Sequence, residues 1–255
     1  MQLEKTLNNY AVEISQEILK CRFRNVDLEF ELSNEVFKPT ATTRILASSM
    51  NIASEEVVID MGCGIGYIGI LAAKLGSRKV YGVDLAEGAC ELARKNVVRN
   101  RVDSIVEIRQ GNLFEPLEGV TADIIVDDVS GIAGLISRNS KSYAHKEIPI
   151  ASDDGSWPTT EMLQEAPKYL SEKGKLYFPL LSLANEEKIM KSAKKSFKYI
   201  DRLTTKTVPL TGEFEENYFN CLKKLHNAGI IRLIQKGSRL CWQLSIFEAL
   251  NYKER

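Results

Sequence analysis

The fold follows from ten residues, Val57-Val58-Ile59-Asp60-Met61-Gly62-Cys63-Gly64-Ile65-Gly66. Residues 57–61 are apolar except for Asp60, and such a run is typical of a strand that is covered on both faces. Three glycines at alternate positions follow, and they allow a sharp turn and a close approach of the backbone to a ligand. A helix is expected from about Tyr67. The stretch therefore predicts a nucleotide-binding crevice at the carboxyl end of a parallel sheet.

The spacing of the glycines and the acid before them indicate which nucleotide binds. The dinucleotide fingerprint is G-x-G-x-x-G, whereas the glycines here are spaced G-x-G-x-G. Asp60 would repel a pyrophosphate but would tolerate a cationic ligand. The stretch resembles motif I of the S-adenosylmethionine-dependent methyltransferases, and the alternative is a glycine-rich turn that binds nothing. The resemblance implies that the cofactor S-adenosyl-L-methionine contacts Asp60, Gly62, Cys63, Gly64 and Gly66.

A second acid follows the next expected strand. The apolar residues 80–83 lead directly to Asp84 and Leu85. A carboxylate at this point can accept hydrogen bonds from both hydroxyls of a ribose. Asp84 resembles the acid that follows motif I in the methyltransferases. The resemblance therefore implies that Asp84 and Leu85 belong to the cofactor site.

Two more strand ends complete the pattern. The strand expected at 106–108 leads to Gly111-Asn112-Leu113-Phe114, which resembles the family's Gly-Asp-Leu-Phe. Asn112 departs from that motif, although its amide oxygen can still accept a hydrogen bond. The resemblance assigns Asn112 and Leu113 to the cofactor. A fourth strand at 121–128 brings Asp127 to the sheet end, where we expect it near the methionine ammonium group.

The order of these units implies the fold class and the domain plan. The resemblance is to class I methyltransferases, so we expect an α/β fold with a Rossmann-like, doubly wound sheet of seven strands, mostly parallel with an antiparallel last strand. Residues 1–35 are expected to form an N-terminal helix/strand extension. Residues 36–255 are expected to form the methyltransferase domain, with a C-terminal helix-hairpin insertion at about 211–239.

The two ends of the chain carry periodic patterns of their own. Residues 3–20 place Leu7, Ile14 and Ile18 on one side of an expected helix, and residues 26–32 alternate as in a half-exposed strand. Near the other end we expect a turn at 172–174 before a strand at 175–181, a helix at 213–227 and strands at 229–234 and 240–247.

The acceptor side departs from the nearest relatives. The layout is most similar to that of the release-factor glutamine and ribosomal-protein methyltransferases, including the lead-in Phe37-Lys38-Pro39-Thr40. The glutamine enzymes carry Asn-Pro-Pro-Tyr after the fourth strand, whereas this chain has Asp128-Val129-Ser130-Gly131. Asp128 resembles the first glutamate of the arginine methyltransferases, whose second acid is missing here. We predict that Asp128 anchors an amine or guanidinium, and the alternative is that it caps the next helix or contacts the cofactor.

A polar loop at 137–157 contains the second candidate for catalysis. His145 is one of only two histidines and would be a general base near neutral pH. An ordinary loop histidine is the alternative. Tyr143 and Trp157 are candidates for the wall of a substrate pocket, or for residues that pack the loop down.

Composition sets the outer limits. The 34 basic and 34 acidic residues balance, so binding of nucleic acid is not expected. Five scattered cysteines without a C-x-x-C pair favour reduced thiols, no metal site and a cytoplasmic location. No apolar run is long enough to span a membrane, and no signal peptide is expected.

These observations leave three hypotheses for function. The first is N-methylation of a small molecule or of a peptide or protein side chain, with an amine or guanidinium favoured by Asp128. The second is methylation of RNA or of a ribosomal protein. The third is a non-catalytic scaffold that binds the cofactor. The expected partner is a small-molecule or peptide substrate, and the C-terminal insertion is a possible contact in a homodimer.

Overall fold

The main sheet has the predicted Rossmann-like order. The computed structural model describes residues 12–15, 18–129, 131–139, 152–210 and 216–250. Eight described strands form this sheet: β4 (Val57–Met61), β5 (Lys79–Asp84), β6 (Val106–Gln110), β7 (Ala122–Asp127), β8 (Leu170–Leu181), β9 (Tyr199–Pro209), β10 (Ile234–Lys236) and β11 (Arg239–Leu250).

The strand order reverses at β4. Strands β5 and β6 follow β4 on one side, and β7 and β8 lie on the other, all in parallel. Strand β11 runs antiparallel between β8 and β9. The predicted mostly parallel sheet with an antiparallel last strand is therefore confirmed, and the short β10 adds an eighth strand to the predicted seven. A ligand crevice is expected where the order reverses, outside the carboxyl end of β4.

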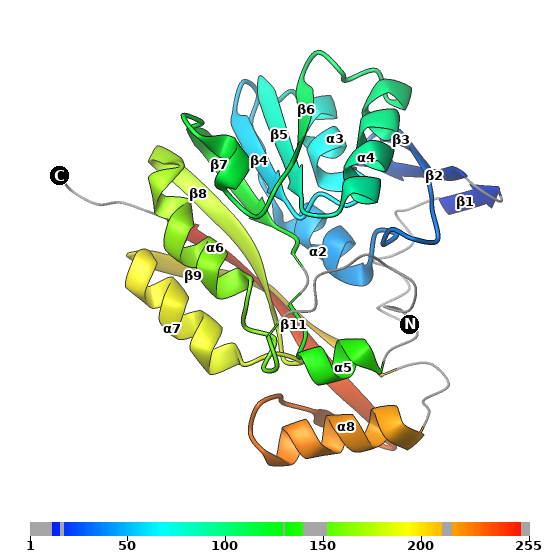
Figure 1. The fold of residues 1–255 in the computed structure, drawn as a ribbon, viewed down its shortest axis with the longest axis vertical. Helices are drawn as coiled ribbons and strands as arrows, with labels where there is room; N and C mark the ends of the chain where they lie inside the picture. The colour runs from blue at the N-terminus through cyan, green and yellow to red at the C-terminus, as the bar shows by residue number, and fades with distance from the viewer. Residues whose placement is uncertain (1–11, 16–17, 130, 140–151, 211–215, 251–255) are drawn as a thin grey trace.

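Helices cover both faces of the sheet (Figure 1). One face packs against α2 (Ala41–Ser49), α3 (Tyr67–Lys74) and α4 (Glu87–Arg99). The other packs against α6 (Thr159–Glu165), α7 (Glu186–Ser196) and the 3-10 turns η1 (Glu115–Leu117) and η3 (Ala166–Lys168). All five residues of β4 are buried, as its apolar run predicts for a central strand.

A third, smaller core lies beyond the end of the sheet. Helix α8 (Glu216–Asn227) stands between β9 and β10 in the chain and packs against α5 (Gly134–Arg138). Their buried contact includes Ala133, Ile136, Leu222 and Leu225. Figure 1 shows α5 and α8 together, away from the helices that cover the sheet.

The N-terminal segment is a sheet where a helix was predicted. Strands β1 (Val12–Ser15), β2 (Ile18–Phe23) and β3 (Val26–Glu31) form an antiparallel sheet of three strands. The expected helix at 3–20 is therefore wrong over 12–15 and 18–20, and its first part lies outside the described residues. The strand expected at 26–32 is confirmed. In β2, Leu19, Cys21 and Phe23 are buried while the residues between them are exposed, which is strand periodicity.

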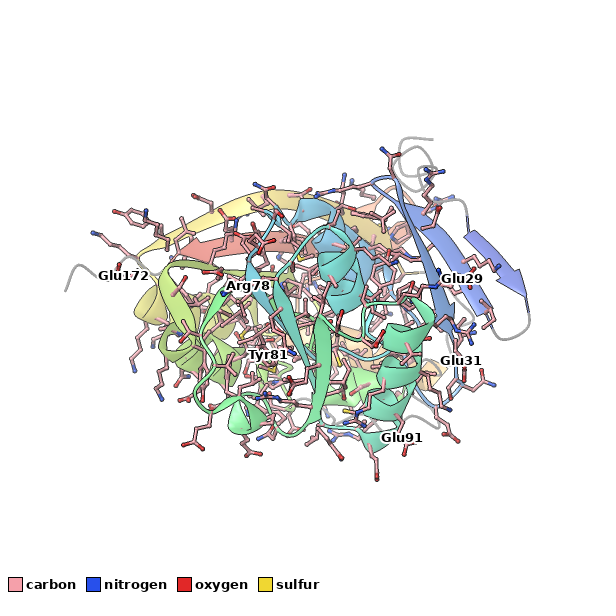
Figure 2. All side chains as sticks on the ribbon, turned by 90° about the horizontal axis from the view of Figure 1, so that it is seen from above. Glu29, Glu31, Arg78, Tyr81, Glu91 and Glu172 are labelled. Atoms are coloured by element: carbon pink, nitrogen blue, oxygen red, sulfur yellow. The ribbon has the colours of Figure 1, made fainter. Side chains whose placement is uncertain are left out.

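Two asparagines, Asn96 of α4 and Asn100 directly after it, attach β3 to the main body. The Asn100 amide accepts from the Glu29 N–H and donates to the Glu29 carbonyl at 3.1 and 2.6 Å. The Asn96 amide does the same for Glu31 at 2.7 and 3.2 Å, and it also donates to the Ile65 carbonyl at 3.0 Å. Figure 2 shows Glu29 and Glu31 on the strand beside α4. The side chains thus replace a neighbouring strand.

Two smaller expectations near the C-terminus differ from the structure. Residues 229–233 are not a strand, because the only strand of that segment is β10, which begins at Ile234. The turn expected at 172–174 lies inside β8, where the pairing with β7 is irregular: Ala122 pairs with Leu170, but Ile124 pairs with Lys175. The other predicted helices and strands are confirmed to within a few residues.

Candidate functional site

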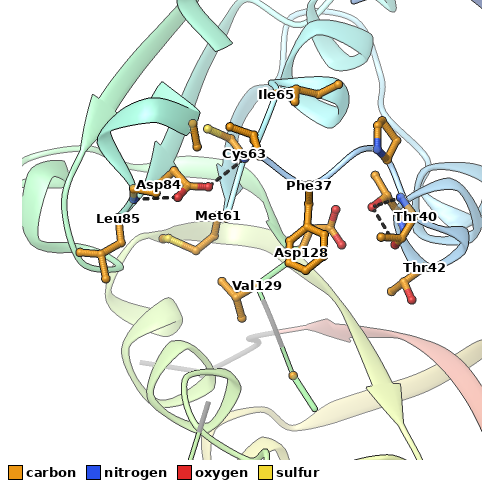
Figure 3. Close-up of a pocket in the computed structure, with 18 of the residues that line it drawn as sticks. Phe37, Thr40, Thr42, Met61, Cys63, Ile65, Asp84, Leu85, Asp128 and Val129 are labelled. Atoms are coloured by element: carbon orange, nitrogen blue, oxygen red, sulfur yellow. Dashed lines mark hydrogen bonds between the residues drawn. The ribbon is translucent and has the colours of Figure 1, made fainter. Parts of the chain in front are cut away.

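The end of β5 holds a carboxylate in a fixed position. Asp84 accepts the Gly64 N–H at 2.9 Å on one oxygen and the Ala86 N–H at 3.0 Å on the other (Figure 3). Burial raises the pKa of Asp84, and the backbone donors oppose that rise. Since each carboxylate oxygen has a second lone pair, Asp84 can still accept hydrogen bonds from two hydroxyls of a ligand.

The glycine loop is held against the neighbouring strand ends. The Gly62 and Cys63 N–H groups both donate to the Val83 carbonyl, at 2.8 and 3.0 Å. Gly62 has a φ of +75°, and a Cβ there would lie 3.0 Å from the backbone of Val129. Only glycine therefore lets the loop lie this close to the end of β7.

Asp60, at the end of β4, has one satisfied and one unsatisfied oxygen. Its Oδ2 accepts the Gly69 N–H in the first turn of α3 at 2.7 Å. Its Oδ1 is buried and has no hydrogen-bond partner among the described residues. Burial raises the pKa of Asp60 to about 7, and the nearby charge of Asp84 adds to the rise. A cationic ligand would stabilise the ionised form of this carboxyl.

These groups line one large cavity (Figure 3). Its volume is about 830 Å³, within the ~300–1,000 Å³ range of small-molecule sites. Nine of the twelve predicted site residues line it: Asp60, Gly62, Cys63, Gly64, Asp84, Leu85, Asn112, Leu113 and Asp128. His145 and Tyr143 lie outside the described residues.

Gly66 and Asp127 support the cavity without lining it. Gly66 precedes α3 with a φ of +85°, and a Cβ there would lie 3.5 Å from Ala93 of α4. Asp127 is fully buried and accepts the Val129 N–H at 3.1 Å. Burial raises the pKa of Asp127 to about 7. Both residues therefore shape the backbone that carries the lining.

Asp128, directly after β7, lies on the other side of the glycine loop from Asp84 (Figure 3). It is half-buried and lines the cavity. Burial raises its pKa well above the usual range; the Thr43 hydroxyl of α2 opposes the rise, and Asp60 and Asp127 add to it. A carboxyl with a raised pKa is a better proton acceptor than an exposed one.

The half of the cavity beyond Asp128 comes from elements without a recognisable motif. It is lined by Trp157 and Pro158 before α6, by Leu181 and Leu183 at and after the end of β8, by Val208, Pro209 and Leu210 of β9 and its exit, by Tyr218 of α8 and by Trp242 of β11. Of these, only Trp157 was a candidate from the sequence. Tyr218 belongs to the apolar side of the helix expected at 213–227, which predicts a core position, and Tyr218 does pack against the third core.

The first half of the cavity fits S-adenosylmethionine. Asp84 offers acceptors for ribose hydroxyls, and the orphaned Asp60 oxygen suits a cation. Leu85 lines the cavity and is 44% exposed. It therefore offers an apolar surface on which a flat ring such as adenine can pack. The Asn112 amide lies on the same side and donates to Glu115 at 3.5 Å.

Cys63 is buried against Gly82 and has a pKa raised well above its usual range, first by burial and then by Asp84 and Asp60. That makes it a packing residue and not a nucleophile.

Comparison with known proteins finds similarity to methyltransferases. Residues 38–146 match the family model of ribosomal protein L11 methyltransferase. The L11 methyltransferase of Alkaliphilus metalliredigens is 38% identical over 114 residues, which are 44% of this chain and 36% of that protein. The Bacillus cereus protein of that name is 32% identical over 134 residues, 52% of this chain and 41% of its own length. The chain thus spans well under half the length of these relatives.

Solved structures share the fold over nearly the whole chain. The tRNA m1G37 methyltransferase of Methanocaldococcus jannaschii aligns with a TM-score of 0.57 and 13% identity, over 94% of this chain and 59% of that one. A putative methyltransferase complexed with S-adenosylhomocysteine (SAH) aligns with a TM-score of 0.55 and 15% identity, over 91% and 57%. At such identities only the fold is shared.

These matches confirm the predicted class and correct the predicted partner. The resemblance to class I S-adenosylmethionine-dependent methyltransferases is confirmed, and S-adenosylmethionine is supported as the cofactor. The expectation of a small-molecule or peptide substrate is wrong, because the related proteins are named for a whole protein substrate. In the described part of the chain, no helix has the length and apolar character needed to cross a membrane.

Proposed function

We propose that this chain is an S-adenosylmethionine-dependent methyltransferase that modifies a nitrogen atom on a protein side chain. One observation carries the proposal. A single cavity joins the Asp84 and glycine-loop geometry to the carboxyl of Asp128. Cofactor and acceptor would therefore meet without a barrier between them, and in-line transfer requires such a meeting.

The two halves of the cavity would have different roles. We call the half that contains Asp84 and the glycine loop the cofactor half, and the half beyond Asp128 the acceptor half. When bound, S-adenosylmethionine supplies a methyl group on a positively charged sulfur. Gly62, Gly64 and Asp84 would hold and orient it. Asp128 would hydrogen-bond the acceptor nitrogen and accept the proton that this nitrogen gives up on becoming methylated. The raised pKa of Asp128 suits that second task.

The names of the relatives support a protein as the substrate. Both curated relatives described above are methyltransferases of ribosomal protein L11. The family match ends at residue 146, so it covers the cofactor half and Asp128 but not α8 or β11. For this reason L11 is the first substrate to test, and the acceptor half of the cavity decides whether it fits.

Two measurements test the proposal. Calorimetric titration with S-adenosylmethionine and with SAH should show binding that is lost in Asp84→Ala. Transfer of a labelled methyl group to purified ribosomal protein L11, or to proteins of a ribosomal extract, should then be abolished by Asp128→Asn while SAH binding is kept. A folded protein that binds neither compound would refute the proposal, and full activity in Asp128→Asn would refute the role of that residue.

A further inference from the structure

The loop before α6 is fastened by one carboxylate that the function above does not use. Asp154 Oδ1 accepts hydrogen bonds from the Ser152 and Ser156 hydroxyls, both at 2.7 Å, and from the Ser156 N–H at 3.1 Å. The Ser152 hydroxyl oxygen in turn accepts the N–H of Trp157 at 3.1 Å. We call Ser152, Asp154 and Ser156 the Asp154 clip.

The other side of the clip is attached to α7. Asp154 Oδ2 accepts from the Lys188 ammonium at 3.3 Å and from the Asn185 amide at 3.5 Å, while the Asp154 carbonyl accepts the Asn185 N–H at 2.8 Å. Burial would raise the pKa of Asp154, but donors from Ser152, Ser156 and Lys188 hold it well below its usual range. The carboxylate is therefore ionised throughout the physiological range, and the clip stays closed.

The clip places the loop directly along the segment that follows Asp128. A Cβ on Gly155 would lie 2.5 Å from the Ala133 nitrogen, so the two backbones are in contact. The Gly134 N–H donates to the Ser152 carbonyl at 3.1 Å. Trp157 lies further along the same loop and lines the cavity, as Asp128 does. The clip thus fixes an aromatic wall for the acceptor half.

The chemistry of this half suits a cation. In addition to Trp157, the rings of Phe37, Tyr218 and Trp242 line the cavity. Over the whole cavity, the acids that line it among the described residues outnumber the bases: Glu35, Asp60, Asp84, Glu87, Glu91 and Asp128 against Lys38. Asp60 and Asp84 serve the cofactor, so Asp128 is the carboxyl that this half offers to an acceptor. Aromatic faces together with a carboxylate attract ammonium and guanidinium groups. A neutral side chain would leave the Asp128 carboxyl without a charged partner.

We infer that Trp157, held by the Asp154 clip, selects the acceptor by forming, with Asp128, a site for a basic protein side chain. Trp157 is the specificity-determining residue, and Asp154 is a positioning residue that acts through it. The inference rests on the proposed function, because the same cavity must hold the cofactor. A clip that served only the fold would leave recognition of the acceptor's charge unchanged when it is opened.

The two tryptophans of the chain make the test direct, since both line the cavity. Trp242→Phe leaves Trp157 as the sole reporter. In the SAH-loaded protein, its fluorescence is titrated with Nα-acetyl-arginine amide, Nα-acetyl-lysine amide and the neutral Nα-acetyl-leucine amide. We expect a saturable response to at least one basic probe and none to the neutral one. Asp154→Ala should weaken that binding at least tenfold, while SAH affinity changes less than twofold.

Matched variants separate positioning from folding. Asp153→Asn is the control, because the Asp153 side chain is 95% exposed and pairs only with Arg138 among the described residues. Asp154→Asn, which keeps an acceptor oxygen for the two serines, should bind the probe with intermediate affinity and replaces Asp154→Ala if that variant does not fold. By calorimetry, Trp157→Phe should retain more affinity for the basic probe than Trp157→Ala.

The experiment distinguishes failure of the proposed function from failure of the inference about Trp157 and the Asp154 clip. If SAH itself does not bind, the proposed function fails. If SAH binds but the neutral probe binds as well as the basic ones, or none of them binds, the inference is overturned. Unchanged probe affinity in folded Asp154→Ala or Asp154→Asn, with Asp153→Asn also unchanged, overturns the role of the clip.

Discussion

Gly62 and Gly64 of the glycine loop have different roles, the first in backbone packing and the second in ligand binding. Gly62 has backbone atoms of Asp128 and Val129 3.0 Å from where a Cβ would stand, whereas Gly64 has nothing within 4 Å. Both have a positive φ, +75° and +52°. We expect Gly62→Ala to lower the free energy of unfolding by roughly 3 kcal/mol, because strain and a backbone clash combine. Gly64→Ala should cost only about 1 kcal/mol.

The second glycine variant should instead affect the ligand. The open space at Gly64 is the cavity itself, so its new methyl group would occupy volume that the cofactor needs. Urea unfolding and SAH calorimetry of the two variants measure both effects. Gly64→Ala should be folded but bind SAH at least tenfold more weakly; full binding by that variant would show that the cofactor does not approach this turn.

Asp60 makes stability depend on pH. Burial raises its pKa from 3.8 to about 7, so the folded chain binds this proton more tightly than the unfolded chain does. The resulting stability is present at low pH and is lost as the pH rises from about 4 through about 7, by on the order of 4 kcal/mol in full. Asp60→Asn removes this dependence and keeps an acceptor for the Gly69 N–H.

Unfolding in urea at pH 5 and pH 8 checks this prediction. The free energy of unfolding should fall less between the two pH values in Asp60→Asn than in the unchanged protein. Asp127, with a pKa also raised to about 7, still contributes its own fall in the variant. Asp153→Asn is again the control, because that carboxylate is exposed. Equal losses in all three proteins would contradict the role assigned to Asp60.

The residues of the cofactor half were predictable because each follows an apolar strand in a recognisable motif. Asp60, Asp84 and Asn112 stand at successive strand ends, and parallel strands bring such ends together. Tyr218 and Trp242 carry no such signal. Their apolar character equally predicts a core, and both do pack against the α5 and α8 core while they also line the cavity.

At the scale of elements, the attachment of β3 to α4 depends on two amides. Asn96 is fully buried and satisfies backbone groups of Glu31 and Ile65. Asn96→Ala leaves these groups without a partner, which costs about 3 kcal/mol or more. Lys95→Ala, one residue earlier on an exposed position, should change stability by less than about 0.5 kcal/mol.

Hydrogen exchange locates the effect of the asparagine. The Glu31 amide proton should exchange faster in Asn96→Ala, while those of β4 keep their protection relative to global unfolding. Unchanged exchange at Glu31 would mean that the small sheet is held by its apolar contacts alone.

The same region shows why one element was mispredicted. Ile14 and Ile18 fit a helical spacing, but Leu19, Cys21 and Phe23 alternate with Lys20 and Arg22. The alternating pattern is the stronger of the two, since it continues into the paired strand β3. For short amphipathic segments, pairing with a neighbouring strand decides between helix and strand. The local sequence of the segment does not show whether such a partner strand exists.

At the scale of the whole molecule, the buried residues of the α5 and α8 core form a different cluster from the two that pack on the sheet, and the partly buried Trp242 contacts both this cluster and the first sheet core. Leu222 of α8 is fully buried in it. Leu222→Ala should loosen this core, at a local cost of about 2–5 kcal/mol, and weaken binding of a basic acceptor probe several-fold. SAH affinity should stay within twofold, because the cofactor half belongs to other elements.

The contrasting variant is Leu71→Ala, a fully buried residue of α3 in the first core. It should lower the stability of the whole sheet and the affinity for SAH together. Calorimetry with both ligands on both variants tests whether the two halves are independent. If Leu222→Ala weakens SAH and the probe equally, the molecule behaves as one packing unit.

The asparagine pair also has a consequence for how this chain behaves among its neighbours. The exposed edge of a small antiparallel sheet is a template on which other chains can polymerise. Along β3 that template is already occupied at Glu29 and Glu31, because Asn96 and Asn100 bind the N–H and C=O groups of these two residues. We therefore expect α4 and the residue after it to oppose the pairing of another chain's strand with this part of β3.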